Sequence, residues 1–285
     1  MRQDSRLFGG VTDHSAEFIA EHSDLLIRGS GYTDPDFPGT YDAHRPSPPD
    51  VLLDVLCRQA QIERPLLVVD LGSGTGLSTR AWAERAAEVL GVEASDEMRA
   101  RSEAATPAPN VRYVHAFAHR TGLPAGTADI VTCSQSLHWM EPEPTFAEAA
   151  RILRPGGVFA AYDYDWPPVV HWEVEQAFEE VLRRVAERRR DRGHRTFPKD
   201  GHLQRMEASG RFRYVREVVL HSRDGGNAGR IVGMALSLGP LAVLLESGIS
   251  EEEVGLAQLR DVSNRVLGDG HVSWLMCYRV RLGVK

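Results

Sequence analysis

Cysteine is scarce in this chain. Its 285 residues contain three, Cys57, Cys133 and Cys277, which lie far apart and include no C-x-x-C pair. Structural zinc sites and disulfide frameworks depend on closely spaced or numerous cysteines, so the sequence predicts neither. We therefore expect a protein of the reducing cytoplasm that holds no metal.

Basic residues are fewer than acidic ones. The chain has 33 Lys and Arg against 40 Asp and Glu, which leaves a formal net charge of −7 at pH 7. Binding to a nucleic-acid backbone depends on Lys and Arg side chains that neutralise phosphates. Nucleic acid is therefore not an expected partner.

Long apolar runs are missing too. The first residues show no apolar stretch of the kind found in signal peptides, and the most apolar helical run, residues 231–245, is too short to span a bilayer. We expect this run to line a substrate pocket or to pack as a cap helix, with a place in the core as the alternative. Neither secretion nor membrane insertion is expected.

The most informative feature that is present is a glycine-rich turn at residues 68–79, VVDLGSGTGLST. An apolar strand leads into an acidic residue and then into Gly72, Gly74 and Gly76, just before a helix begins. Glycine permits a tight turn and lets a ligand lie against main-chain amides. Dinucleotide-binding turns have the spacing G-x-G-x-x-G, and Leu77 stands where they need a small residue, so this turn favours a ligand without a pyrophosphate.

Glu93 is the second part of this signal. It ends a short apolar strand predicted over residues 88–93 and lies 21 positions after Gly72. In a βαβ unit this distance returns the chain to the carboxyl edge of the neighbouring parallel strand. A carboxylate there can accept hydrogen bonds from both hydroxyls of a ribose, so the turn and Glu93 together predict a nucleoside site.

These residues resemble the class I S-adenosylmethionine-dependent methyltransferases, in the small-molecule branch that includes trans-aconitate and ubiquinone-pathway methyltransferases. The resemblance covers about residues 41–165. Besides the turn and Glu93 it rests on four segments, which are YDAHRPSPP at 41–49, VRYVHAFAH at 111–119 with ADIV at 128–131, SLHW at 136–139 and AARILRPGG at 149–157.

The resemblance implies S-adenosyl-L-methionine as the cofactor and methyl transfer to an oxygen, nitrogen or carbon atom of a small molecule as the reaction. It also implies which residues hold the methyl donor, namely Tyr41, Arg45, Asp70, Gly72, Ser73, Gly74, Thr75, Gly76, Glu93, Ala94, Met98, Ala118, His119 and Ser134. The family usually has an acidic residue where His119 stands, so we expect the backbone at Ala118 to contact the adenine.

Methyl transfer from a sulfonium mainly requires that the acceptor and the methyl group be held in line, and orientation alone can lower a barrier by about 7–11 kcal/mol. A general base helps only when the acceptor has a proton to lose. His138 is the candidate base, because it follows the fourth predicted strand and imidazole titrates near neutral pH. The alternative is that His138 and Trp139 form a packed wall of the donor pocket.

Other polar residues have two interpretations each. Arg45 could pair with the carboxylate of the donor or of an acidic substrate, or it could act with Tyr41 as a structural cap. Asp70 could orient the glycine turn or bind the amino group of the donor, or it could cap the turn that follows. The remaining candidate histidines, His44, His171 and His194, are expected to be surface or structural residues.

The pattern and the resemblance together predict an α/β fold with a Rossmann-like, doubly wound sheet of seven strands, an antiparallel edge strand and an inserted helical cap. The strands are expected at 66–70, 88–93, 111–115, 128–133, 157–163, 213–220 and 271–281. The expected parts of the chain are a covering arm at 1–50 with an amphipathic stretch at 16–27, a donor-binding core at 51–165, a helical cap at 166–212 and C-terminal strands with a helical insertion at 213–285. We expect the protein to be a monomer or a homodimer.

The expected cap begins with a helix whose apolar residues recur at helical spacing, which are Val174, Phe178, Val181, Leu182 and Val185. Its other side joins an arginine run at 183–195, which we interpret as a solvated helix end, with a patch for anionic substrates as the alternative. Trp166, Trp172 and the run at 231–245 favour an acceptor that is partly apolar.

Two other functions compete with methyl transfer. One is an NAD-dependent oxidoreductase, which Leu77 and the lack of a Tyr-x-x-x-Lys motif argue against. The other is a non-catalytic binding or regulatory protein that keeps the donor fold, which the intact turn and Glu93 argue against. Cofactor preference separates the first from a methyltransferase, and methyl transfer to any acceptor excludes the second.

Overall fold

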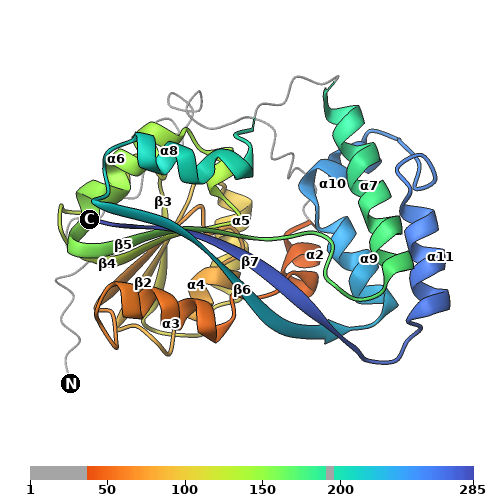
Figure 1. The fold of residues 1–285 in the computed structure, drawn as a ribbon, viewed down its shortest axis with the longest axis horizontal. Helices are drawn as coiled ribbons and strands as arrows, with labels where there is room; N and C mark the ends of the chain where they lie inside the picture. Colours follow the sequence, from red (N-terminus) through yellow and green to blue (C-terminus); the bar gives the residue numbers. More distant parts are fainter. Residues whose placement is uncertain (1–36, 191–195) are drawn as a thin grey trace.

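The structure is a computed structural model that describes residues 37–190 and 196–285. Its described part contains one seven-stranded sheet with the order β3-β2-β1-β4-β5-β7-β6 (Figure 1). The strands are β1 (Leu67–Leu71), β2 (Glu88–Glu93), β3 (Val111–His115), β4 (Ala128–Ser134), β5 (Leu153–Tyr164), β6 (Tyr214–Gly226) and β7 (Val272–Val284). Strands β1 to β5 are parallel, and β7 runs antiparallel to both of its neighbours, β5 and β6. The predicted Rossmann-like fold with an antiparallel pair at its edge is confirmed.

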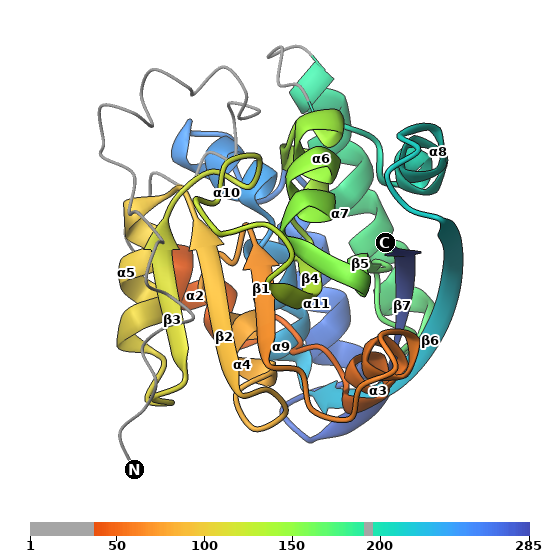
Figure 2. The same cartoon turned by 90° about the vertical axis from the view of Figure 1, so that its left-hand side faces the viewer.

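Strand β1 shows why this sheet forms from nearly continuous apolar runs. Leu67, Val69 and Leu71 pack into one core cluster, whereas Val68 packs into the cluster on the other face. Both faces of a parallel sheet are buried by helices, so the residues of β1 are apolar except for the buried Asp70. One face is covered by α3 (Asp50–Gln59) and α4 (Leu77–Ala81), and the other by α6 (Pro142–Ile152) and α8 (His202–Ala208) (Figure 2).

The last two strands are longer than predicted. Strand β6 was expected to end at residue 220, but its pairing with β7 continues through Asp224 opposite Trp274 to Gly226 opposite Val272. Residues 221–226 are mostly polar, but they lie on an edge strand, where side chains can face water without breaking the ladder. The sequence pattern therefore understated the length of this hairpin.

A helical lobe extends from one end of the sheet (Figure 1). It is formed by α2 (Phe37–His44), α7 (Trp172–Arg190), α9 (Ala228–Leu236), α10 (Gly239–Glu246) and α11 (Leu256–Val266). The predicted apolar side of α7 is confirmed by the burial of Val174, Phe178, Val181 and Val185, with Leu182 half-buried against the same core. The proposed division of the chain at residues 50, 165 and 212 stays a prediction.

The apolar run at 231–245 is two helices and not one. Helices α9 and α10 meet at an angle of 78°, with the break before Gly239 and Pro240. Proline has no N–H and cannot continue a helix, but it suits the first turn of a new one. Within the described residues no single helix is long and apolar enough to cross a membrane, and this bent pair meets that test only when its two helices are taken together.

Two expectations fall wholly or partly on residues that the structure does not describe. Residues 1–36 of the predicted arm, which include the stretch at 16–27, lie outside the described residues. So do residues 191–195 of the arginine run, which include His194. Arg183 and Arg184 both bind Glu180, which agrees with a solvated, ion-paired helix end.

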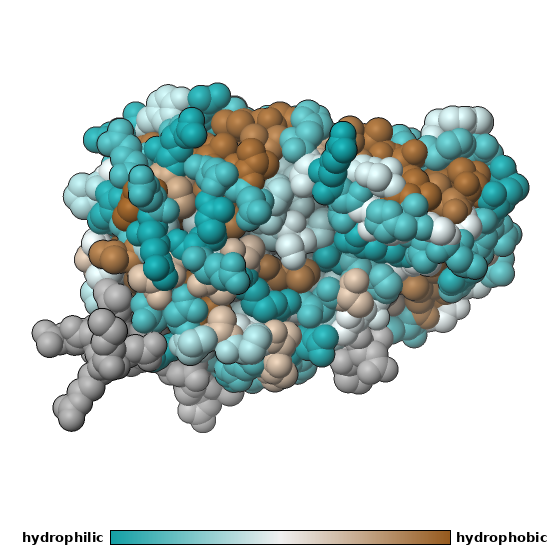
Figure 3. All heavy atoms as spheres, turned by 90° about the horizontal axis from the view of Figure 1, so that it is seen from below, coloured by the Kyte–Doolittle hydropathy of each residue, from teal (hydrophilic) through white to brown (hydrophobic). Residues whose placement is uncertain are grey.

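Seen from below, the surface is mostly hydrophilic and its apolar side chains gather in separate patches (Figure 3).

Candidate functional site

A pocket lies at the carboxyl ends of β1, β2 and β4. In an open α/β sheet ligands bind where the strand order reverses, which here is between β1 and β4. The cavity has a volume of about 240 Å³ and is lined by Tyr41, Gly72, Ser73, Gly74, Thr75, Leu77, Ser78, Val92, Glu93, Ala94, Ser95, Met98, Ala116, Ala118, His119, Ser134, Gln135, Ser136, Trp139, Met140 and Thr145. Eleven of the fourteen residues expected to hold a donor therefore line one cavity.

The glycine turn is held in a conformation that favours glycine. The φ angles of Gly72, Gly74 and Gly76 are +65°, +56° and +84°. A Cβ atom on Gly72 would lie 2.4 Å from Cε of Met140, whereas a Cβ atom on Gly74 would meet nothing within 4 Å. Gly74 thus leaves open space in the pocket wall where a side chain would otherwise project, as a ligand cradle requires.

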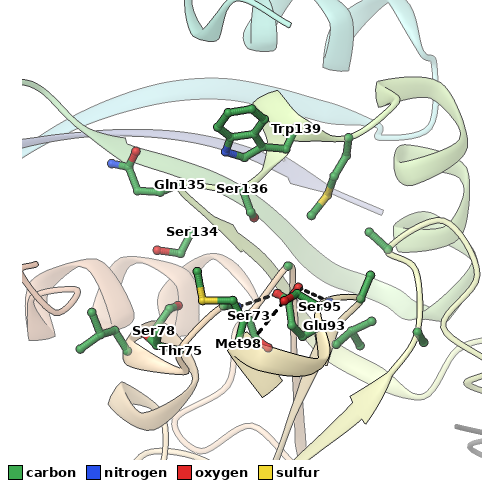
Figure 4. A pocket seen from close by; sticks show the side chains of 18 of the residues that line it. Ser73, Thr75, Ser78, Glu93, Ser95, Met98, Ser134, Gln135, Ser136 and Trp139 are labelled. Atoms are coloured by element: carbon green, nitrogen blue, oxygen red, sulfur yellow. Dashed lines mark hydrogen bonds between the residues drawn. The ribbon is translucent and has the colours of Figure 1, made fainter. Parts of the chain in front are cut away.

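Glu93 is fixed by main-chain amides at the end of β2. Gly74 N donates to its Oε2 at 2.7 Å and Ser95 N donates to its Oε1 at 2.9 Å (Figure 4). Burial raises the pKa of Glu93, and these two backbone hydrogen bonds oppose that rise. A carboxylate oxygen can accept more than one hydrogen bond, so both oxygens keep capacity for a ligand.

Asp70 lies beneath the turn and does not line the cavity. Its carboxylate is fully buried and accepts hydrogen bonds from Thr79 Oγ1 at 2.8 Å and Thr132 Oγ1 at 2.7 Å. Burial raises the pKa of Asp70 to about 6. Asp70 therefore ties the first turn of α4 to β4, and its predicted roles toward the glycine turn and the donor stay predictions.

The opposite wall comes from the end of β4 and the residues after it. Figure 4 shows Gln135, Ser136 and Trp139 across the pocket from Ser73 and Glu93. Trp139 was predicted as a possible wall, whereas Gln135 and Ser136 were not predicted as site residues. Both follow directly after a parallel strand, at the sheet edge where ligands bind, and Ser136 also begins the SLHW segment of the resemblance.

Arg45 is not a lining residue. Its Nε and Nη2 donate to Oγ and the carbonyl oxygen of Ser237 at 2.7 and 2.8 Å, and its Nη1 donates to the Tyr164 hydroxyl at 2.6 Å. The guanidinium also lies 4.7 Å from the ring centre of Tyr41 and 5.1 Å from that of Trp166. It thus ties α2, which carries Tyr41, to the end of α9 and to β5, and its contact with a donor carboxylate stays a prediction.

His138 does not line the cavity either. Burial lowers the pKa of its imidazole well below the usual range, and the nearby Lys199 ammonium lowers it further. Its Nδ1 atom is buried and has no hydrogen-bond partner in the described structure. The imidazole is therefore neutral near pH 7, and its role as a base stays a prediction.

The remaining candidates are placed as follows. Gly76 precedes α4 and a Cβ atom there would lie 2.3 Å from the Tyr113 hydroxyl, so this glycine serves packing below the pocket. His44 packs against Gly233 of α9. No group of three or more potential metal ligands occurs in the parts of the chain that the structure describes.

The fold and its pocket define a Rossmann-like domain that binds a ligand at the switch point of the sheet. Residues 69–161 match the family model described as a methyltransferase domain. This part of the chain is therefore similar to methyltransferase domains.

Curated relatives that match part of the chain are methyltransferases as well. An uncharacterised methyltransferase of Mycobacterium tuberculosis is 35% identical over 119 residues, which are 42% of this chain and 46% of that protein. A trans-aconitate 2-methyltransferase of Azoarcus is 36% identical over 120 residues, which are 40% of this chain and 46% of that protein. The chain thus spans about half the length of the curated relatives it matches.

Solved structures extend the similarity of fold beyond that region. A proposed type II methyltransferase of Anaeromyxobacter dehalogenans has a TM-score of 0.60 and 22% identity, and the match covers 84% of this chain and 97% of that one. A phosphoethanolamine N-methyltransferase of Haemonchus contortus, solved with S-adenosyl-L-methionine, has a TM-score of 0.52 and 17% identity, with 94% and 59% covered. The predicted resemblance to class I methyltransferases is confirmed.

Proposed function

We propose that this protein is an S-adenosyl-L-methionine-dependent methyltransferase that acts on a small-molecule acceptor. The observation that carries the proposal is the arrangement at Gly74 and Glu93. The amide of Gly74 holds the Glu93 carboxylate beside a wall position where no Cβ atom obstructs the cavity. A ribose lying against that position could donate both of its hydroxyls to one carboxylate.

Two buried polar atoms near the same turn support a bound ligand. Ser73 Oγ and Thr75 Oγ1 have no hydrogen-bond partner in the described part of the chain, although both residues are buried. Buried polar atoms are normally satisfied, so a ligand or water is expected to complete them. The polar groups of an adenosyl and methionyl donor are suitable partners.

Each wall of the pocket has a part in donor binding. Glu93 would hold the ribose, the backbone at Ala118 would contact the adenine beside His119, and Met98 would cover the nucleoside. Ser134, at the end of β4, would face the methionyl end of the donor. Related evidence comes from the Haemonchus contortus structure of the same fold, which was solved with this donor.

The chain contributes mainly orientation and the exclusion of water. When bound, S-adenosyl-L-methionine supplies a methyl group that is already activated by its sulfonium. Tyr41 on α2 and Trp139 after β4 both line the cavity, where their rings would hold an acceptor in a defined direction. Orientation of this kind can supply about 7–11 kcal/mol.

A calorimetric titration tests the proposal directly. Purified protein is titrated separately with S-adenosyl-L-methionine, S-adenosylhomocysteine and NADH. We expect the two sulfur nucleosides to bind in the micromolar range and NADH not to bind. Binding of NADH alone would favour an oxidoreductase. If none of the three compounds binds, the proposal is contradicted.

A non-catalytic binding protein would also pass that titration, so a second assay is needed. Protein is incubated with methyl-labelled S-adenosyl-L-methionine and a metabolite extract, and labelled products are separated by chromatography. A new labelled product that Glu93→Ala abolishes is expected. Donor binding with no product from any extract would favour the binding protein over the enzyme.

A further inference from the structure

Gln135 occupies an unusual backbone position in the pocket wall. Its φ angle is +53°, in the left-handed region that side chains other than glycine seldom adopt. The conformation is held in place because Gln135 N donates to the Tyr162 carbonyl oxygen at 3.0 Å. Strain of this kind is kept where the surrounding structure needs a side chain in one direction.

Lys199 fixes the orientation of the Gln135 amide. Its Nζ donates to Gln135 Oε1 at 2.5 Å. A lysine ammonium has no acceptor, so the amide oxygen must face Lys199 and the amide nitrogen must face away. The Nε2 group makes one long contact, 3.5 Å to the Tyr164 carbonyl oxygen, which leaves N–H capacity for a molecule in the cavity.

An ammonium group that is paired with a carboxylate stands behind this amide. Lys199 is anchored by Asp163 Oδ1 at 2.8 Å, and Asp163 is bound from its other oxygen by the buried Arg281, also at 2.8 Å. Among the described residues that line the cavity, Glu93 is the one Asp or Glu, and it lies on the opposite wall with both oxygens already bound by amides. The wall at Gln135 thus offers a hydrogen-bond donor backed by a cation.

We propose that Gln135 binds the methyl acceptor and that the acceptor presents an anionic oxygen, a carboxylate or a phenolate, to its Nε2. Lys199 acts as a positioning residue, since it orients and polarises the amide without lining the cavity. The proposal rests on the proposed methyltransferase function. An oxygen anion already carries the electron pair that forms the new O–CH3 bond while the S–CH3 bond of the donor breaks and S-adenosylhomocysteine leaves. No base is therefore required, in agreement with the position of His138 outside the lining.

The test uses matched probes that differ in charge. Benzoate is compared with benzamide, and 4-nitrophenolate with 4-nitroanisole, by NMR titration of the full chain with and without S-adenosylhomocysteine. We expect at least one ionised probe to bind about tenfold more tightly than its neutral partner. The pair that shows the preference distinguishes a carboxylate from a phenolate. Equal binding within both pairs, or no binding of any probe, would overturn the proposal.

Variants show whether the preference depends on Gln135. Glycine tolerates a positive φ, so Gln135→Gly removes the side chain without backbone strain, and Gln135→Leu keeps its bulk. Both should lower the affinity for the ionised probe about tenfold and leave that for S-adenosylhomocysteine within about twofold. Gln176→Leu, on an exposed position of α7, is the control and should change neither. A preference that survives in both Gln135 variants would overturn the proposal.

Lys199 is tested by removal and by conservative replacement. Lys199→Met should lower the preference for the ionised probe, whereas Lys199→Arg should retain most of it, because a cation still faces the amide oxygen. Equal losses in the two variants would contradict the positioning role. Failure of the proposed function gives a different result, which is the absence of S-adenosylhomocysteine binding by the unmodified protein.

Discussion

Replacing Glu93 by glutamine tests the donor pocket with a change of one atom. In the protein, the two carboxylate oxygens accept amide hydrogens from Gly74 and Ser95 at 2.7 and 2.9 Å. Glutamine has one oxygen, so its NH₂ group must face one of these two N–H donors, and one hydrogen bond is lost. A ligand hydroxyl also loses its charged acceptor. Hydrogen bonds to charged groups contribute about 1.5–3 kcal/mol each.

Donor affinity should therefore fall by about 2–4 kcal/mol, which is roughly 30- to 1000-fold. The assay is calorimetric titration with S-adenosylhomocysteine, accompanied by circular dichroism to show that the variant is folded. Glu97→Gln is the matched control, because Glu97 lies in the first turn of α5 (Asp96–Ala104), is exposed, and accepts a hydrogen bond from Ser95 Oγ at 2.9 Å. A folded Glu93→Gln variant that keeps donor affinity within about twofold would refute the reasoning.

Three further predictions follow from the same geometry. Gly74→Ala should lose donor binding and should lower the free energy of unfolding by about 1–2 kcal/mol. Gly126 also has a positive φ and open space at its Cβ position, so Gly126→Ala should lose the same stability in urea denaturation but keep donor binding. Equal donor affinities of the two variants would contradict the role of Gly74 in the pocket wall. Because burial raises the pKa of Asp70 from 3.8 to about 6, its contribution to the free energy of unfolding is full below pH 4 and falls by roughly 3 kcal/mol as the pH rises through about 6. Asp70→Asn should remove this decline, and parallel pH profiles for the two proteins would count against it. Arg45→Lys should lower the free energy of unfolding by about 1–3 kcal/mol, because lysine cannot reproduce the hydrogen bonds of the guanidinium group. Arg58 is exposed, so the control Arg58→Lys should have no effect. An unchanged melting temperature of Arg45→Lys would show that these hydrogen bonds are dispensable.

The parallel half of the sheet could be predicted from sequence because its signals are local. Each strand is a short apolar run that ends in turn residues, and the predicted ranges of β2 and β3 agree with the structure to the residue. The gathering of Gly72, Gly74 and Glu93 at one cavity could be expected as well, since parallel strands bring their carboxyl ends to one edge.

Features that depend on distant residues could not be predicted in this way. The hydrogen bonds of Arg45 to Ser237 join positions 192 residues apart, and no sequence pattern links them. Likewise, Lys199 reaches Gln135 across 64 residues, and the place of Gln135 directly after β4 gave no sign of this partner. The break between α9 and α10 is different, because Pro240 was visible and was given too little weight against the apolar run.

A crystal structure of the protein with S-adenosylhomocysteine tests the central claim most directly. We predict that the ribose hydroxyls lie within hydrogen-bonding distance of Glu93, that the nucleoside lies against Gly74, and that the adenine lies beside Ala118. A nucleoside bound elsewhere on the molecule, or bound in this cavity without contact to Glu93, would contradict it.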